Sequence, residues 1–190
     1  EKGVDESLQR LGVDSIDLYY LHRPIMGCKT KEQLVQAMRA LKACVLKGKI
    51  RHIGLSEIGV EWLRVAHAVH PIAAIQMEWS LASREIEADI VPVCIELGIG
   101  IVAYAPLARL MLALNKDEIA KPEAVIGSGW AAMQFERYLG ENLATNLRLM
   151  DQVAAMAAAK RCSTAQLSLA WLYHRARQMG VPMIAIPGTS

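Results

Sequence analysis

Short apolar runs alternate with segments of helical period along the chain, and this alternation limits most strongly what the chain can form. Five runs of six residues are mostly β-branched, aliphatic or aromatic, as in strands that are buried on both faces. They lie at residues 16–21, 50–55, 72–77, 99–104 and 181–186. This order predicts a parallel sheet with right-handed helical crossovers.

Segment 30–47 carries the clearest helix pattern. Thr30 and Gln33 have the spacing of a capping box, and Gly48 supplies a stop. The apolar residues that share one face are Leu34, Met38, Leu41 and Val45. A second helical period ends before Gly98, and Pro92 predicts that its regular part begins late.

A pair of helices is predicted before the last apolar run. Ser163 and Gln166 have capping-box spacing at the start of the second helix. The residues expected on the two helices are Leu143, Leu147, Met150 and Ala154, then Leu167, Ala170, Trp171 and His174.

Two known folds are built around a parallel sheet of this kind. A Rossmann sheet needs a Gly-rich turn after its first strand, and none of the five runs is followed by one. A (β/α)8 TIM barrel places its chemistry at the carboxyl ends of many strands. Polar or glycine-rich segments end or follow the runs here: Gln76 and Tyr104 lie at run ends, and His22, Ser56 and Gly188 follow runs. Because a barrel needs eight strands and about 250 residues, we expect residues 1–190 to form one domain that is part of a larger barrel.

Composition excludes several classes of protein. With 53% hydrophobic residues, 21% charged residues and a mean hydropathy of +0.22, the chain is able to bury a large core. Its net charge is +2 and its basic residues are scattered, which argues against a nucleic-acid or anionic-membrane partner. No apolar run approaches the roughly 20 residues of a membrane span.

The cysteines bear on location and metal binding. Cys28, Cys44, Cys94 and Cys162 form no C-x-x-C pair. This spacing favours free thiols in a reducing compartment over a disulfide framework or a zinc site. We therefore expect a cytoplasmic protein without a metal.

Four stretches in order carry a specific resemblance: SLQRLGVDSIDLYYLHRP, GKIRHIGLSE, IQMEWSLASREIEADIVPVCIELGIGIVAYAPL and IPGTS. Together they resemble the aldo-keto reductase family, especially its plant and microbial branch. The match runs almost continuously from Ser7 to Leu107 and returns from Thr164 to Ser190. It implies that the five runs are strands four to eight of the family barrel.

The resemblance implies reduction of aldehydes and ketones by NADPH, with hydride passing to the carbonyl carbon. A tyrosine tuned by a lysine and an aspartate protonates the oxygen in the family, and we expect these three residues in a preceding part of the protein. The histidine of the family's L-H-x-P pattern matches His22. An imidazole there donates a hydrogen bond to the developing alkoxide. The alternative is that His22 only caps its strand.

The resemblance also implies four cofactor positions at strand ends. Ser56 and Gln76 match the residues that hold the nicotinamide carboxamide, and Glu57 stands where many members have asparagine. An amide suits the carboxamide because it offers both a donor and an acceptor. Tyr104 matches the aromatic residue that stacks on the nicotinamide ring. Gln76 bonding to backbone and Tyr104 packing in the core are the alternatives.

The resemblance also implies cofactor contacts for three further segments. Ala105, Pro106 and Leu107 with Ala108 replace the family's Ser-Pro-Leu-Gly, so that backbone N–H groups are left to contact the pyrophosphate. Gly188 and Thr189 resemble the start of the loop that receives the adenosine phosphate. Segment 108–140 is a candidate cofactor-covering loop.

Packing or solvation is an alternative to a functional role for two side chains near the third run. Trp79 is predicted either to line the substrate mouth or to pack in the core. Glu87 is expected to be solvated, together with Arg84 and Glu85.

Two functional classes stay open. The first is an NADPH-dependent reductase of a small-molecule carbonyl, and residues 1–190 alone are expected to show negligible catalysis. The second is a non-catalytic NADPH-binding regulatory subunit on the same barrel, like the potassium-channel beta subunits. The physiological carbonyl and the oligomeric state do not follow from the sequence.

Overall fold

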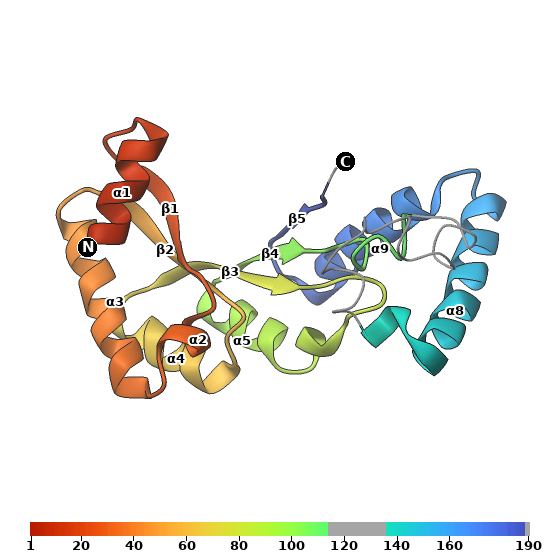
Figure 1. The fold of residues 1–190 in the computed structure, drawn as a ribbon, viewed down its shortest axis with the longest axis horizontal. Helices are drawn as coiled ribbons and strands as arrows, with labels where there is room; N and C mark the ends of the chain where they lie inside the picture. The colour runs from red at the N-terminus through yellow and green to blue at the C-terminus, as the bar shows by residue number, and fades with distance from the viewer. Residues whose placement is uncertain (114–135, 189–190) are drawn as a thin grey trace.

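Five parallel strands form a single sheet in the order β1-β2-β3-β4-β5 (Figure 1). The computed structural model describes residues 1–113 and 136–188. The strands are β1 (Ile16–Leu21), β2 (Ile50–Ser56), β3 (Ile72–Glu78), β4 (Gly100–Tyr104) and β5 (Met183–Ile186). Each predicted apolar run overlaps one of them, so the predicted parallel sheet is confirmed.

Helices cover one face of this sheet. They are α1 (Lys2–Leu11), α2 (Pro24–Gly27), α3 (Lys31–Leu46), α4 (Val60–Val69), α5 (Ile90–Leu97), α8 (Gly140–Ala159) and α9 (Thr164–Met179), with 3-10 turns η1 (Glu85–Glu87) and η2 (Glu136–Tyr138). The α3, α4 and α5 helices lie on one side of the sheet, and α8 and α9 lie at the end away from α1 (Figure 1). The main core forms between this helical layer and strand residues such as Leu55, Ile75 and Ile101.

The outer strands are less buried than the sequence predicts. Ile184 and Ile186 of β5 are 63% and 43% exposed, and Asp17 of β1 is an exposed partner of Arg51. The expectation that all strands are buried on both faces is therefore wrong for β1 and β5. Each of these strands has a neighbour on one side only within the described sheet, and the helices cover a single face.

The predicted helix boundaries depend on caps that the structure largely confirms. In α9 the Ser163 hydroxyl accepts from the Gln166 amide and the Gln166 side chain accepts from the Ser163 amide, which completes the capping box. At α3 only half of the predicted box forms, because Gln33 Oε1 accepts from Lys29 N instead of Thr30 N. Pro92 occupies the third position of α5, where its missing N–H costs no hydrogen bond.

The buried faces of the last two helices match the prediction in part, since Leu143, Leu147, Met150, Leu167 and Trp171 pack in the apolar clusters. Ala154 is exposed, and the buried residues of α8 are Met150, Val153 and Ala157. Likewise Ala170 and His174 are exposed, and α9 buries Ser168, Leu172 and Ala176. In both helices two neighbouring stripes fit the helical period, and tertiary packing decides which of them is buried.

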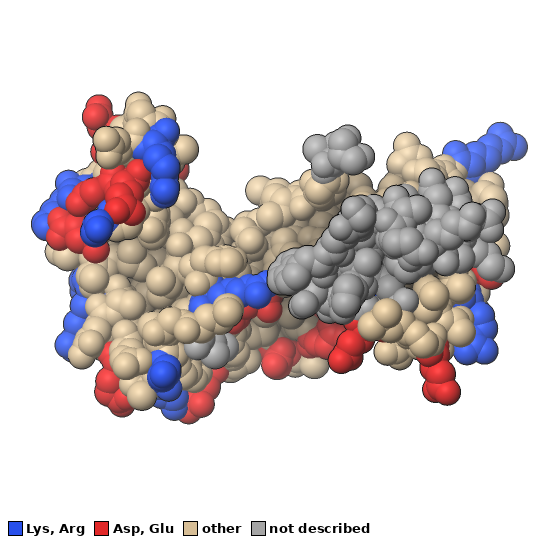
Figure 2. All heavy atoms as spheres, in the orientation of Figure 1, with Lys and Arg blue, Asp and Glu red and all other residues tan. Residues whose placement is uncertain are grey.

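The sheet face opposite the helices is hollow. Tyr19 and Leu21 pack against the main core, so the alternation along β1 turns Tyr20 toward the other face. The Tyr20 ring lies directly over Gly54 of β2. A Cβ atom added to Gly54 would be only 2.5 Å from Tyr20 Cε1, so that a larger residue at this position would clash with the ring. Figure 2 shows this hollow between α1 and the C-terminal end, with a surface made mainly of uncharged residues.

Candidate active site

Strand register brings the predicted site residues to one edge of the sheet. Leu21 pairs with Leu55, and Ser56 pairs with Gln76, so His22 follows β1 at the level of Ser56 and Gln76. Two residues further along, Tyr104 pairs with both Glu78 and Ile186. Because parallel strands end at the same edge, the polar residues at the ends of adjacent strands lie close together along this edge.

The end of β2 is held in a left-handed turn. Ser56 is buried, at 3% exposure, whereas His22 is exposed and Gln76 is half-buried. Glu57 has φ of 50°, and its N–H donates to the Gln76 carbonyl at 3.1 Å. A non-glycine residue in this region is uncommon and is often found at functional sites.

Glu57 also connects β2 with the ends of β3 and β4. Its Oε1 accepts from Glu78 N at 3.3 Å, and its carboxylate accepts a hydrogen bond from Tyr104. Burial of the phenol, followed by this hydrogen bond and the negative charge of Glu57, raises the pKa of Tyr104 to about 12. The hydroxyl therefore keeps its proton at neutral pH, and Tyr104 offers a ligand chiefly its ring.

Arg109 lies against this ring. Its guanidinium carbon is 5.7 Å from the ring centroid of Tyr104, within cation–π range. Its Nη2 donates to Glu78 Oε2 at 2.9 Å. Stacking of a flat ligand ring on Tyr104 would therefore use the opposite face.

The turn after β4 has an unusual backbone. The φ angles of Ala105, Ala108, Arg109 and Leu110 are 46°, 51°, 55° and 80°, in the left-handed region that disfavours residues with a side chain. The N–H groups of Leu107 and Leu110 donate no hydrogen bond to the described residues. Unpaired N–H groups on left-handed turns form concave sites that suit anions.

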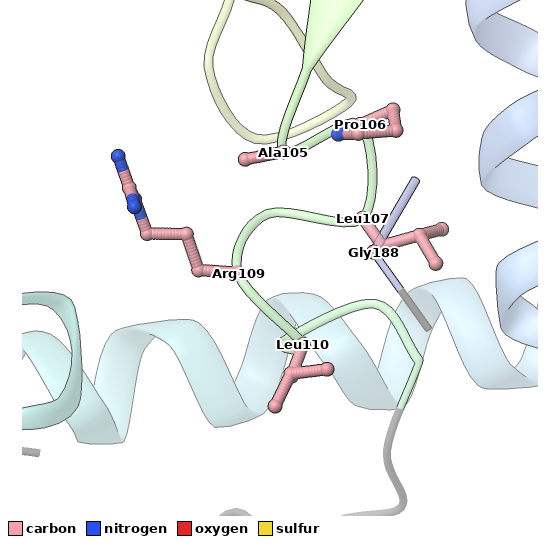
Figure 3. Close-up of a pocket in the computed structure, with 6 residues that line it drawn as sticks. All are labelled: Ala105, Pro106, Leu107, Arg109, Leu110 and Gly188. Atoms are coloured by element: carbon pink, nitrogen blue, oxygen red, sulfur yellow. The ribbon is translucent and has the colours of Figure 1, made fainter. Parts of the chain in front are cut away.

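A cavity of about 330 Å³ adjoins this turn (Figure 3). It is lined by Ala105, Pro106, Leu107, Arg109, Leu110 and Gly188. The Leu107 side chain lies beside Gly188, whereas the Arg109 guanidinium points away from Gly188 (Figure 3). The structure thus brings the predicted positions after β4 together with Gly188 after β5, and Thr189 lies outside the described residues.

The surroundings of Trp79 match the packing alternative. The Trp79 side chain is fully buried, and its Nε1 donates to Glu87 Oε1 at 3.1 Å. A contact between Trp79 and substrate stays a prediction.

Glu87 is not solvated, and that expectation is wrong. Its side chain is 10% exposed and accepts from Arg84 Nη2 at 2.8 Å and from Arg175 Nη2 at 2.9 Å. Arg175 lies 88 positions away in the chain, so no local pattern in the sequence indicates this pair.

Sequence reasoning also missed the part played by Glu78. Arg109 and Arg137 both donate to its carboxylate, each at 2.9 Å. The only local signal is a charged residue that follows Gln76 by two positions, on the same strand face.

The candidate cofactor-covering loop is partly described. Residues 108–113 pack on α8 through Ala108, Met111 and Leu112, which contact Met150 and Val153 in a second apolar cluster. Residues 136–140 form η2 and the first residue of α8. Residues 114–135 lie outside the described part, so covering of the cofactor stays a prediction.

The described ranges, 1–113 and 136–188, contain neither a metal-binding cluster nor a helix that could span a membrane. No group of three or more His, Cys, Asp or Glu side chains there is arranged to hold a metal ion. No helix in these ranges combines the length and apolarity that crossing a membrane requires.

Comparison with known proteins assigns the family. A family model, described as the Aldo/keto reductase family, matches residues 1–190. The chain belongs to the aldo-keto reductase family.

Solved structures agree with this assignment. A glycerol dehydrogenase of Gluconobacter oxydans is 26% identical with a TM-score of 0.78, and the match covers 98% of this chain and 54% of that one. An aldo-keto reductase of Klebsiella pneumoniae in complex with NADPH is 26% identical with a TM-score of 0.65, over 98% and 52%. The same organism's aldo/keto reductase with NADP and acetate is 25% identical with a TM-score of 0.63, over 99% and 53%.

The chain spans about half the length of these solved relatives. Its five parallel strands with alternating helices match about half of the aldo-keto reductase barrel, so the predicted fold class is confirmed.

Proposed function

We propose that the protein is an oxidoreductase that transfers hydride from NADPH to the carbonyl carbon of an aldehyde or ketone. The observation that carries this proposal is the strand register, which sets Ser56, Gln76 and Tyr104 at one edge of the sheet. The turn that lines the 330 Å³ cavity directly follows Tyr104. The NADP and NADPH complexes of the Klebsiella pneumoniae relatives support the choice of cofactor.

The residues present fit a nicotinamide dinucleotide. The Gln76 amide and the Ser56 hydroxyl supply the donors and acceptor that a carboxamide needs, and Tyr104 supplies a ring. The N–H groups of Leu107 and Leu110, which donate to none of the described residues, suit a pyrophosphate. Gly188 and Thr189 would receive the adenosine end. Burial and the Glu57 carboxylate, which raise the pKa of Tyr104, would keep the Tyr104 hydroxyl protonated beside the ring site.

His22 acts on the substrate in this proposal. Its exposed imidazole, level with Ser56 and Gln76, donates a hydrogen bond to the carbonyl oxygen and stabilises the developing alkoxide. Bound NADPH supplies the hydride. By the family resemblance, the proton comes from a tyrosine tuned by a lysine and an aspartate outside residues 1–190.

The proposal extends to the kind of substrate and to the location of the protein. We propose a small-molecule carbonyl substrate and a cytoplasmic protein. The four cysteines are all free thiols in the structure, and burial raises the pKa of Cys94 to about 12, which keeps it protonated and unreactive.

The test follows NADPH oxidation by the full-length protein with a panel of aromatic and aliphatic aldehydes. We expect oxidation that depends on both aldehyde and enzyme. If the protein binds NADPH but does not oxidise it, the reductase function is wrong and the non-catalytic regulatory subunit is the better interpretation. Absence of both binding and turnover would overturn both functions.

A further inference from the structure

The carboxylate of Glu78 ties together three segments that are distant in sequence. Oε2 accepts from Arg109 Nη2 at 2.9 Å, and Oε1 accepts from Arg137 Nη2 at 2.9 Å and from Ser83 Oγ at 3.3 Å. Arg109 belongs to the turn after β4, Arg137 to η2, and Ser83 to the turn after β3. One side chain at the end of β3 is therefore bonded to both described ends of the segment 108–140.

These contacts are better shielded than the surface ion pairs of the chain. The side chains of Glu78, Arg109 and Arg137 are 18%, 28% and 25% exposed, whereas the Arg51–Asp17 pair is 67% and 78% exposed. Partial burial strengthens charge-assisted hydrogen bonds, and it raises the cost of leaving one partner unpaired.

The geometry around Arg109 links Glu78 to the cavity. Bound to Glu78 and placed over Tyr104, the Arg109 guanidinium points away from Gly188 (Figure 3). The backbone of the same residue belongs to the left-handed turn that lines the cavity. Glu78 thus restrains the strained turn from its outer side, while the inner side faces Gly188.

Arg137 extends the restraint to α8. Its carbonyl accepts from Asn146 Nδ2 at 2.7 Å, and residues after the turn pack on the same helix. The turn is therefore restrained through Arg109 and through its support on α8, and Glu78 contributes to both.

We propose that Glu78 is a positioning residue for cofactor binding, which acts through Arg109 to hold the turn from Ala105 to Leu110 in the conformation that accepts a pyrophosphate. This inference rests on the proposed NADPH-dependent function. Glu78 itself touches neither the cofactor nor the substrate in this arrangement.

The first test measures NADPH affinity of the full-length protein by fluorescence titration. We expect Glu78→Gln to weaken NADPH about tenfold, because the neutral amide holds two arginines less firmly. Reduced nicotinamide riboside, which carries no phosphate, should bind the variant and the wild type alike. Glu96→Gln is the matched control, because Glu96 also pairs with an arginine, Arg64, but at an exposed site.

A double-mutant cycle separates positioning from a general structural role. If Glu78 acts through Arg109, Glu78→Gln should add less than about twofold to the effect of Arg109→Gln. Additive losses, tighter NADPH binding by Glu78→Gln, or equal weakening for the riboside would each overturn the proposal.

A variant that does not fold, or one that behaves like the control, also gives a clear result. If Glu78→Gln does not fold, Glu78→Asp keeps the charge but is one methylene shorter, and we expect a loss of about threefold; unchanged affinity would count against positioning. If the wild type binds NADPH and Glu78→Gln matches Glu96→Gln, positioning fails and the proposed function stands. A wild type that does not bind NADPH overturns both.

Discussion

Replacing His22 with alanine lowers kcat/KM for aldehyde reduction by about 100-fold, because the developing alkoxide loses a hydrogen-bond donor. The loss should appear in kcat, since the donor acts on charge that forms in the transition state. The Kd of NADPH should stay unchanged, since Ser56, Gln76 and Tyr104 are intact. Steady-state kinetics and a binding titration of the full-length protein measure the two effects separately.

His174→Ala is the control for this substitution, because His174 is exposed on α9. It should leave both kcat and the Kd of NADPH unchanged. His22→Gln should recover part of the lost rate, since its amide still donates. If His22→Ala keeps kcat/KM within threefold of the wild type, His22 only caps its strand.

Replacing Glu87 with glutamine lowers the free energy of unfolding by about 2 kcal/mol, because charge-assisted hydrogen bonds become neutral ones. Glu87 accepts from Trp79, Arg84 and Arg175, and so joins the end of β3 to α9. The Arg84 guanidinium also lies 5.0 Å from the ring centroid of Trp171 on α9. Urea unfolding of the full-length protein measures the change, with exposed Glu85→Gln as the control.

The same carboxylate predicts a dependence of stability on pH. Hydrogen bonds from Arg84 first, and then from Arg175 and Trp79, lower the pKa of Glu87 from 4.5 to about 2 against the opposing effect of burial. A carboxyl with a lowered folded-state pKa stabilises fully above its unfolded pKa, and this contribution is lost as the pH falls through the folded value. Between about pH 4.5 and 2, Glu87→Gln should therefore lose less stability than the wild type. Equal losses would contradict the network.

Local pattern was sufficient to predict the strands and most helix caps. Residues 16–21 coincide with β1, and the Ser163–Gln166 box forms as expected, since both depend on neighbours in sequence. The position of His22, Ser56, Gln76 and Tyr104 at one edge also followed from the parallel order. The assignment of their roles came from the family resemblance.

What the sequence did not show depends on contacts between distant segments. Arg137 lies 59 positions from Glu78, and Arg175 lies 88 positions from Glu87. Ala154 was expected on the buried face of α8, and Val153 and Ala157 are buried there instead, because the helix period does not say which stripe meets the turn after β4. Partners of this kind are fixed only when the tertiary structure has formed.

If the carboxyl edge of the strands holds a nicotinamide cofactor, a crystal structure of the full-length protein with NADP will show the cofactor there. We expect the carboxamide within about 3 Å of the Ser56 hydroxyl and the Gln76 amide. The nicotinamide ring should stack on Tyr104, and the pyrophosphate should lie at the turn from Ala105 to Leu110. A cofactor bound elsewhere, or bound at this edge without contacts to Ser56 and Gln76, would contradict the account.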